Sequence, residues 1–112
     1  MEQAARAFLK SCDVNSQYLD PRHDRCYCAE CYSASWPDCI SNEGPTDYVV
    51  PRGWYRFGLQ VPSRAAVLDI FEQWSVCFHG VKSTAVLQSI LDCGQLMKPG
   101  DVLLDNTTLR SA

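Results

Sequence analysis

The tightest group of cysteines in this chain lies in residues 25–32, Arg25-Cys26-Tyr27-Cys28-Ala29-Glu30-Cys31-Tyr32. Three thiols fall within six residues there, a spacing that suits one tetrahedral metal site better than separate disulfides. Zinc sites take thiolate and imidazole ligands from turns of this kind, and the fold brings in the remaining ligands. The segment therefore predicts a zinc knuckle around which the N-terminal part of the chain is organised.

Further candidate ligands flank this segment, because Cys12 and His23 precede it and Cys39 follows it. We predict a structural zinc site with four protein ligands, since a catalytic zinc keeps one position open for water. The predicted ligands are Cys12, Cys26, Cys28 and Cys31, with His23 as the substitute and Cys39 as a further candidate. Two alternatives stay open: an iron–sulfur cluster on the same thiolates, or buried free thiols that pack like small hydrophobic residues.

The composition is that of an ordinary globular protein. The chain has 112 residues, of which 46% are hydrophobic and 21% are charged, and its net charge is −3. This slight acidity gives no global attraction to nucleic acid or anionic lipid. No apolar run approaches the roughly 20 residues of a membrane helix. We therefore expect neither a nucleic-acid partner nor a membrane partner.

The compartment is inferred from the cysteines and the N-terminus. The chain has seven cysteines, an odd number, so at least one thiol has no partner for a disulfide. Residues 1–6 lack the basic-then-apolar order of a secretory signal. Reducing compartments keep cysteines metal-bound or free. We expect an intracellular protein, cytoplasmic or nuclear, and leave its oligomeric state open.

Residues 1–52 are expected to form the cysteine-rich, zinc-binding module. Residues 2–11 place their apolar side chains at helical spacing, so this helix would deliver Cys12 to the cluster. Residues 33–52 hold three prolines and are expected to be a loop.

Residues 53–112 are expected to form a second domain that begins with a strand over 54–61, rich in aromatic and branched side chains. A helix over about 64–73, with Ser63 as its N-cap, should follow. Its predicted buried face is Val67, Leu68, Phe71 and Trp74.

A second strand over 75–79 and a second helix continue this domain. Ser83 or Thr84 would cap that helix and Gly94 would end it. Its predicted core face is Val86, Leu87, Ile90 and Leu91. Pro99-Gly100 then predicts a turn into a short strand over 102–104. Together these elements predict an α+β fold, in which a small N-terminal module held together by zinc is followed by a strand–helix–strand–helix unit.

The His-Gly pair at the end of the second predicted strand carries a resemblance. His79-Gly80 and the helix that closes on Gly94-Gln95-Leu96 resemble the opening of ADP-ribosyltransferases of the poly(ADP-ribose) polymerase type. There, a His on a strand contacts the adenosine ribose of NAD, and the following Gly grips the nicotinamide amide through its backbone. The resemblance assigns these roles to His79 and Gly80. Val81 departs from the Thr or Ser that usually follows.

A wider pattern, from about residue 12 to 105, is similar to the C-terminal region of the Neuralized-like protein 4 family. It joins the cysteine knuckle to an aromatic strand, the His-Gly pair and a Pro-Gly-Asp turn. The residues that carry it are Tyr48, Pro51, Gly53, Trp54, Arg56, Phe57, Leu59, Trp74, His79, Gly80, Pro99, Gly100 and Asp101.

Catalysis is not expected from this chain by itself, and no catalytic residue is assigned. The stacking Tyr and the Glu of the transferases lie on strands well after the His-Gly pair, and neither residue type occurs after His79. The sequence is expected to be either part of a longer transferase or a transferase-like fold without catalysis. Trp36 and Tyr32 are expected to be exposed near the metal, where they would suit a protein partner. The predicted function is a zinc-binding protein-interaction module. The alternative is the N-terminal part of an active transferase that uses NAD.

Overall fold

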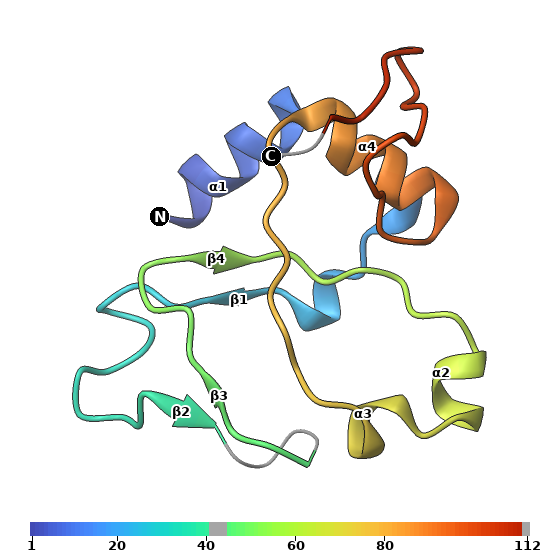
Figure 1. Cartoon of the computed structure of the whole chain (residues 1–112). Coiled ribbons are helices and arrows are strands. Elements are labelled where there is room, and N and C mark those ends of the chain that lie inside the picture. The colour runs from blue at the N-terminus through green and yellow to red at the C-terminus, as the bar shows by residue number, and fades with distance from the viewer. Residues whose placement is uncertain (41–44, 111–112) are drawn as a thin grey trace. The chain divides into compact units, whose positions relative to one another are not determined.

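The computed structural model describes residues 1–40 and 45–110, and within them the chain is α+β, with four α-helices and two small antiparallel sheets (Figure 1). The helices are α1 Glu2–Ser11, α2 Arg64–Val67, α3 Ile70–Gln73 and α4 Thr84–Cys93, with 3-10 turns η1 Ser16–Tyr18 and η2 Pro21–His23. The strands are β1 Arg25–Cys26, β2 Cys39–Ile40, β3 Tyr48–Val49 and β4 Tyr55–Arg56. The chain divides into two compact units, unit 1 (Met1–Phe78) and unit 2 (His79–Ala112).

Helix α1 confirms the helix predicted over 2–11. Glu2 lies in its first turn and Lys10 in its last, where each charge complements the helix dipole. Arg6 pairs with Glu2 one turn away at 3.1 Å and with Asp24 at 3.3 Å. The second pair ties α1 to the segment that precedes β1.

Unit 1 is built on an antiparallel pairing between β1 and β4. Arg25 lies opposite Arg56, and Cys26 lies opposite Tyr55. The pairing continues beyond the strands on both sides: the Tyr27 N–H donates to Trp54 O at 2.9 Å, and the Gln60 N–H donates to Tyr18 O at 2.9 Å.

The predicted domain boundary between residues 52 and 53 cuts through this pairing. Because β4 forms its hydrogen bonds with β1, residues 53–61 belong with the cysteine segment, and unit 1 extends to Phe78. The strand predicted over 54–61 is shorter than expected, with Tyr55 and Arg56 in β4 and Leu59 in an isolated bridge to Leu19.

The second pair corrects the prediction that residues 33–52 are all loop. Strands β2 and β3 pair antiparallel, with Cys39 opposite Val49 and Ile40 opposite Tyr48. The prolines of this region lie outside both strands, so they do not interrupt the ladder.

The core of unit 1 is small. Its core cluster joins the buried Tyr27, Tyr32 and Val50, with Ile40 packed against them, and Cys12 and Ala65 are buried as well. Tyr32 was predicted to be exposed, but it is buried, and its hydroxyl donates to Pro37 O at 2.7 Å. A phenol can be buried when its O–H finds an acceptor in this way.

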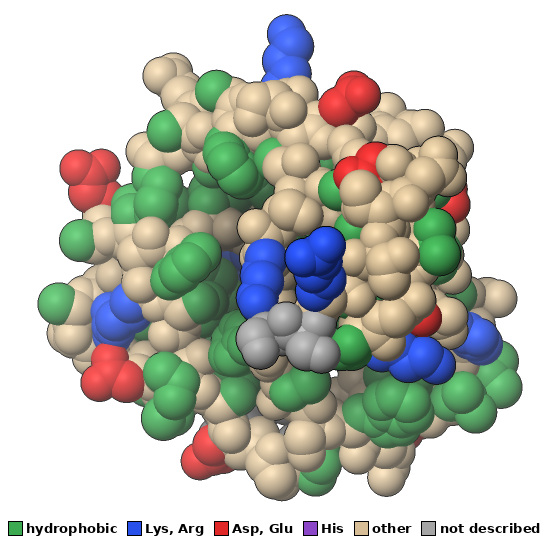
Figure 2. Space-filling model, turned by 45° about the horizontal axis from the view of Figure 1, so that its top comes forward, with side chains coloured by type: hydrophobic (Ala, Val, Ile, Leu, Met, Phe, Trp, Pro, Cys, Tyr) green, Lys and Arg blue, Asp and Glu red, His purple; other side chains and the backbone are tan. Residues whose placement is uncertain are grey.

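The helix predicted over 64–73 is broken into α2 and α3. Asp69 adopts a left-handed conformation between them, with φ of 52°. The predicted buried face is wrong, since Val67 is 84% exposed and Leu68, Phe71 and Trp74 are exposed as well. Hydrophobic side chains also occur on the face of the molecule that Figure 2 draws. Two short helices joined by this bend do not present one continuous apolar stripe.

The strand predicted over 75–79 does not form. Among the described residues, none pairs with this segment in a ladder, and an extended segment without a partner is not a strand. Cys77 in this segment is consequently exposed, and Cys93 at the end of α4 is exposed as well.

Unit 2 confirms the second predicted helix and both of its caps. The Ser83 hydroxyl accepts from the Val86 N–H at 3.3 Å, and Gly94 ends α4 with a φ of 73°. Of the predicted core face, Val86 is buried, and Leu87, Ile90 and Leu91 are half-buried. The predicted turn at Pro99-Gly100 forms, but the strand over 102–104 is reduced to one bridge between Val102 and Thr108.

Among the helices of residues 1–40 and 45–110, none combines the length and the hydropathy that crossing a bilayer requires.

Candidate metal centre

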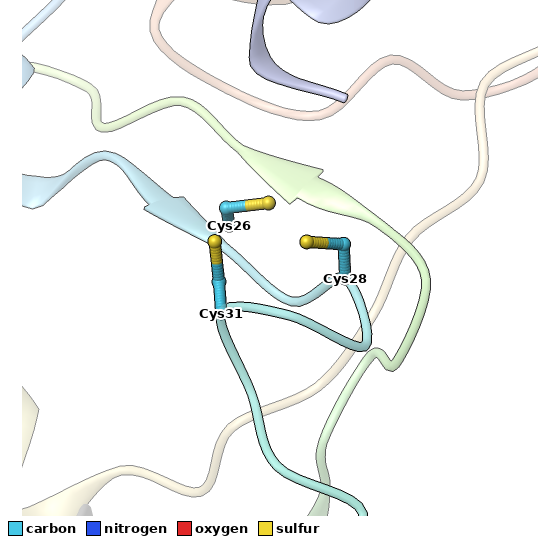
Figure 3. Close-up of side chains that lie close together, drawn as sticks. All are labelled: Cys26, Cys28 and Cys31. Carbon is cyan, nitrogen blue, oxygen red and sulfur yellow. The ribbon is translucent and has the colours of Figure 1, made fainter.

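Three of the four predicted zinc ligands lie together at the end of β1 and in the turn that follows it. The sulfur atoms of Cys26, Cys28 and Cys31 all lie within 4.8 Å of one another. Figure 3 shows that the three side chains point toward a common space from two sides of the turn. This convergence gives one cation access to three thiolates.

The backbone of the turn positions these sulfurs. The N–H groups of Cys31 and Tyr32 both donate to Cys28 O, at 3.1 Å and 2.8 Å. Cys26 is fixed separately by its place opposite Tyr55 in the ladder. The end of β1 therefore positions Cys26, and the turn positions Cys28 and Cys31. This explains how Cys26 and Cys28 can face the same space with only one residue between them.

The turn also polarises the thiols. The Cys31 backbone N–H, with help from the Cys26 side chain, lowers the pKa of Cys28 from 9.0 to about 7. Hydrogen bonding to Cys28 and Cys26 raises the pKa of Cys31 from 9.0 to about 11. One thiolate thus forms easily, whereas a second beside it is opposed by the first. A divalent cation removes that opposition, because its charge stabilises every thiolate that it binds.

The donor set fits zinc. Three thiolates on a tight turn are soft ligands that select zinc, copper(I) or iron–sulfur clusters over magnesium or calcium. Cys28 and Cys26 are half-buried and Cys31 is exposed, so an ion can reach the sulfurs from solvent.

The other predicted ligands lie outside this group. Cys12 is buried at the C-terminal end of α1, and Cys39 is exposed in β2. His23 faces Asp20, whose carboxylate lies 3.7 Å from its Nε2. Within the part of the chain described, the metal-competent group is Cys26, Cys28 and Cys31. The fourth ligand stays a prediction.

The residues assigned to NAD by resemblance lie at the start of unit 2. His79 and Gly80 are exposed and belong to no helix or strand. A Cβ added at Gly80 would meet no atom within 4 Å, so the surroundings do not require glycine there. NAD binding at this pair stays a prediction.

The sequence reasoning missed a group of arginines stacked on the core tyrosines. The Arg25 guanidinium lies 5.1 Å from the Tyr27 ring centroid and 5.6 Å from that of Tyr32. Arg52 stacks on Tyr32 at 4.8 Å, and Arg56 lies 5.9 Å from Tyr27. The signal in the sequence is the alternation Arg25-Cys26-Tyr27, which places the arginine and the tyrosine on one face of a strand.

The sequence matches no known protein-family model. The search of solved structures found no match either.

Proposed function

We propose that this chain is a zinc-binding protein-interaction module in which Cys26, Cys28 and Cys31 hold one zinc ion. The observation that carries the proposal is the convergence of these three sulfurs within 4.8 Å of one another. Cys12 remains the predicted fourth ligand, with His23 and Cys39 as the alternatives. Zinc bound here would act structurally, by joining the end of β1 to the turn that follows it.

The small core supports a structural role for the metal. Three buried side chains and one half-buried neighbour make up the core cluster of unit 1. Domains with little apolar burial commonly depend on a metal or a disulfide. None of the seven cysteines, all of which lie in described residues, forms a disulfide in this structure. Zinc binding would supply the missing stabilisation.

Interaction with a protein is supported by the exposed side chains near the cysteines. Trp36, which stacks edge-on against Tyr32 at 5.0 Å, is 47% exposed. Trp54, next to β4, is 72% exposed. Tryptophan and arginine concentrate binding energy at protein interfaces. The proposal includes no catalytic step, and the exposed His79-Gly80 pair adds none to it.

The test is the metal content of protein purified without added metal. The proposal requires about one zinc per chain, lost in a Cys26→Ser, Cys28→Ser and Cys31→Ser triple variant. The matched control is a Cys77→Ser and Cys93→Ser double variant, whose exposed thiols lie outside the group. Zinc retained by the triple variant, or iron in place of zinc, would overturn the assignment.

A further inference from the structure

Arg25 and Arg56, on the paired strands β1 and β4, have no acidic partner among the described residues, although other arginines of unit 1 do. Arg6 forms ion pairs with Glu2 and Asp24. Arg22 pairs with Asp20, and Arg52 pairs with Asp38. Within residues 1–40 and 45–110, no such pair involves Arg25 or Arg56. We call Arg25 and Arg56 together the arginine pair.

The arginine pair places two like charges directly opposite each other. Arg25 and Arg56 are cross-strand partners in the β1–β4 ladder, an arrangement that destabilises a sheet when nothing neutralises it. An anion between the two guanidiniums would turn this repulsion into attraction. Without such an anion, the arginine pair is a local excess of positive charge on a protein whose net charge is −3.

The position of the Arg25 side chain favours binding of such an anion. Its guanidinium carbon lies over the rings of Tyr27 and Tyr32, 5.1 Å and 5.6 Å from their centroids, and the N–H donors of a guanidinium lie in its plane. No hydrogen bond joins its side chain to the described part of the chain, and the residue is exposed. The stacking restricts the side chain while its planar fork stays available for bidentate binding of a carboxylate.

Arg56 completes the site. Its Nε donates to His23 O at 3.0 Å, and Nη1 donates to the Tyr27 hydroxyl at 3.2 Å. These bonds fix the guanidinium while leaving Nη2 without a partner among the described residues. The ladder places Arg25 and Arg56 on one face and Cys26 and Tyr55 on the other. The charge of the arginine pair is therefore directed away from the Cys26 side chain.

We propose that the arginine pair binds the carboxylates of an acidic segment of a partner protein. This inference rests on the proposed function, because it names the chemistry of the partner that the module would bind. Carboxylate matches the forked geometry of guanidinium, and the exposed Trp54 beside β4 offers an apolar contact for the same segment. A protein of net charge −3 repels the long phosphate backbone of a nucleic acid, whereas a short acidic segment requires only local attraction.

The experiment uses the zinc-loaded full chain and the peptide Glu-Glu-Leu-Glu-Glu, with Gln-Gln-Leu-Gln-Gln as the uncharged control. Binding is followed by NMR through the arginine Nε–H and tryptophan indole signals. The glutamate peptide should shift the signals of Arg25, Arg56 and Trp54. Arg25→Gln should weaken binding about tenfold or more, as expected for loss of a hydrogen bond between charged groups. Arg25→Lys should rescue it only in part.

Arg64→Gln is the matched control, because Arg64 is an exposed arginine of the same unit outside the pair. It should leave peptide binding unchanged. Equal shifts with both peptides, or unchanged binding by Arg25→Gln, would overturn the inference. So would a single-stranded oligonucleotide of matched charge that binds at Arg25 when the glutamate peptide does not.

Zinc content is measured on the same samples. If zinc is present and the peptide fails to bind, this inference fails while the zinc module stands. If the peptide binds to protein that takes up no zinc, the zinc proposal fails and the arginine pair stands as a binding surface.

Discussion

The backbone N–H of Gly58 donates to Oδ1 of Asp24 at 2.8 Å. This bond joins the segment that follows β4 to the residue that precedes β1. The Gly58 carbonyl accepts in return from the Asp20 N–H at 2.8 Å. These bonds set the distance between residues 20–24 and β4. The position of β1, and of Cys26 at its end, depends on them.

Gly58→Ala should therefore destabilise the chain. A Cβ at this position would collide with the Asp20 backbone oxygen and lie 2.6 Å from the His23 Cβ. Backbone cannot move aside as a flexible side chain can, so we expect a loss of about 1–3 kcal/mol, typical of overpacking. Urea unfolding measures it. Gly80→Ala, with no atom within 4 Å of the added Cβ, should change stability by less than about 0.5 kcal/mol. Equal stability of the two variants would contradict the close packing.

The Asp20 carboxylate should titrate at unusually low pH. The Arg22 side chain, which donates from Nε at 2.9 Å and from Nη2 at 2.7 Å, lowers the pKa of Asp20 from 3.8 to about 2. A carboxylate with a depressed pKa stabilises the fold at pH above about 4, and this contribution is lost as the pH falls from 4 to 2. Carboxyl ¹³C NMR should give a midpoint near 2 that rises in Arg22→Gln. A midpoint near 3.8 in the unmodified chain would refute the ion pair.

Arg52 should hold the segment that leads away from the cysteines. Its side chain donates to Asp38 Oδ1 at 2.7 Å, to Trp36 O at 2.6 Å and to Ser33 O at 3.1 Å. A lysine keeps the charge but cannot reproduce this fork. We expect Arg52→Lys to lower the free energy of unfolding by about 1–2 kcal/mol, measured in urea. Arg64→Lys serves as the control, and a neutral effect at both positions would count against the three-bond arrangement.

Ser89 should connect α4 to the segment after the Pro99-Gly100 turn. It is 1% exposed, its hydroxyl donates to Ala85 O at 2.7 Å, and its oxygen accepts from the Leu104 N–H at 3.0 Å. Ser89→Ala should remove the acceptor of Leu104 and weaken unit 2 by about 1–2 kcal/mol. Hydrogen exchange at the Leu104 amide should accelerate. Ser63→Ala, at an N-cap without a side-chain cap bond, should not alter that exchange. Unchanged exchange in Ser89→Ala would show that the bond is not formed.

Local signals in the sequence predicted several elements correctly. The amphipathic spacing of residues 2–11 gave α1, and the Ser83 cap with Gly94 bounded α4. The spacing of Cys26, Cys28 and Cys31 predicted the cluster, because residues this close in the chain need only one turn to meet.

The remaining predictions were wrong because they depended on contacts and backbone conformations that the local sequence pattern does not show. The β1–β4 pairing joins residues far apart in the chain, and nothing in the local pattern of residues 53–61 showed that their partner was the cysteine segment. The apolar spacing of residues 64–74 was consistent with one buried helix, but the left-handed Asp69 breaks it and leaves Phe71 exposed. The burial of Tyr32 depends on the Pro37 carbonyl as an acceptor, which only the folded turn supplies.

The most direct measurement is X-ray absorption at the zinc edge on protein purified without added metal. Zinc held by this cluster should show three or four sulfur ligands at about 2.3 Å. Cys12→Ser should reduce that number by one if Cys12 is the fourth ligand, and Cys28→Ser should reduce it or abolish zinc binding. Absence of zinc, or zinc coordinated only by oxygen and nitrogen, would contradict a zinc centre built on Cys26, Cys28 and Cys31.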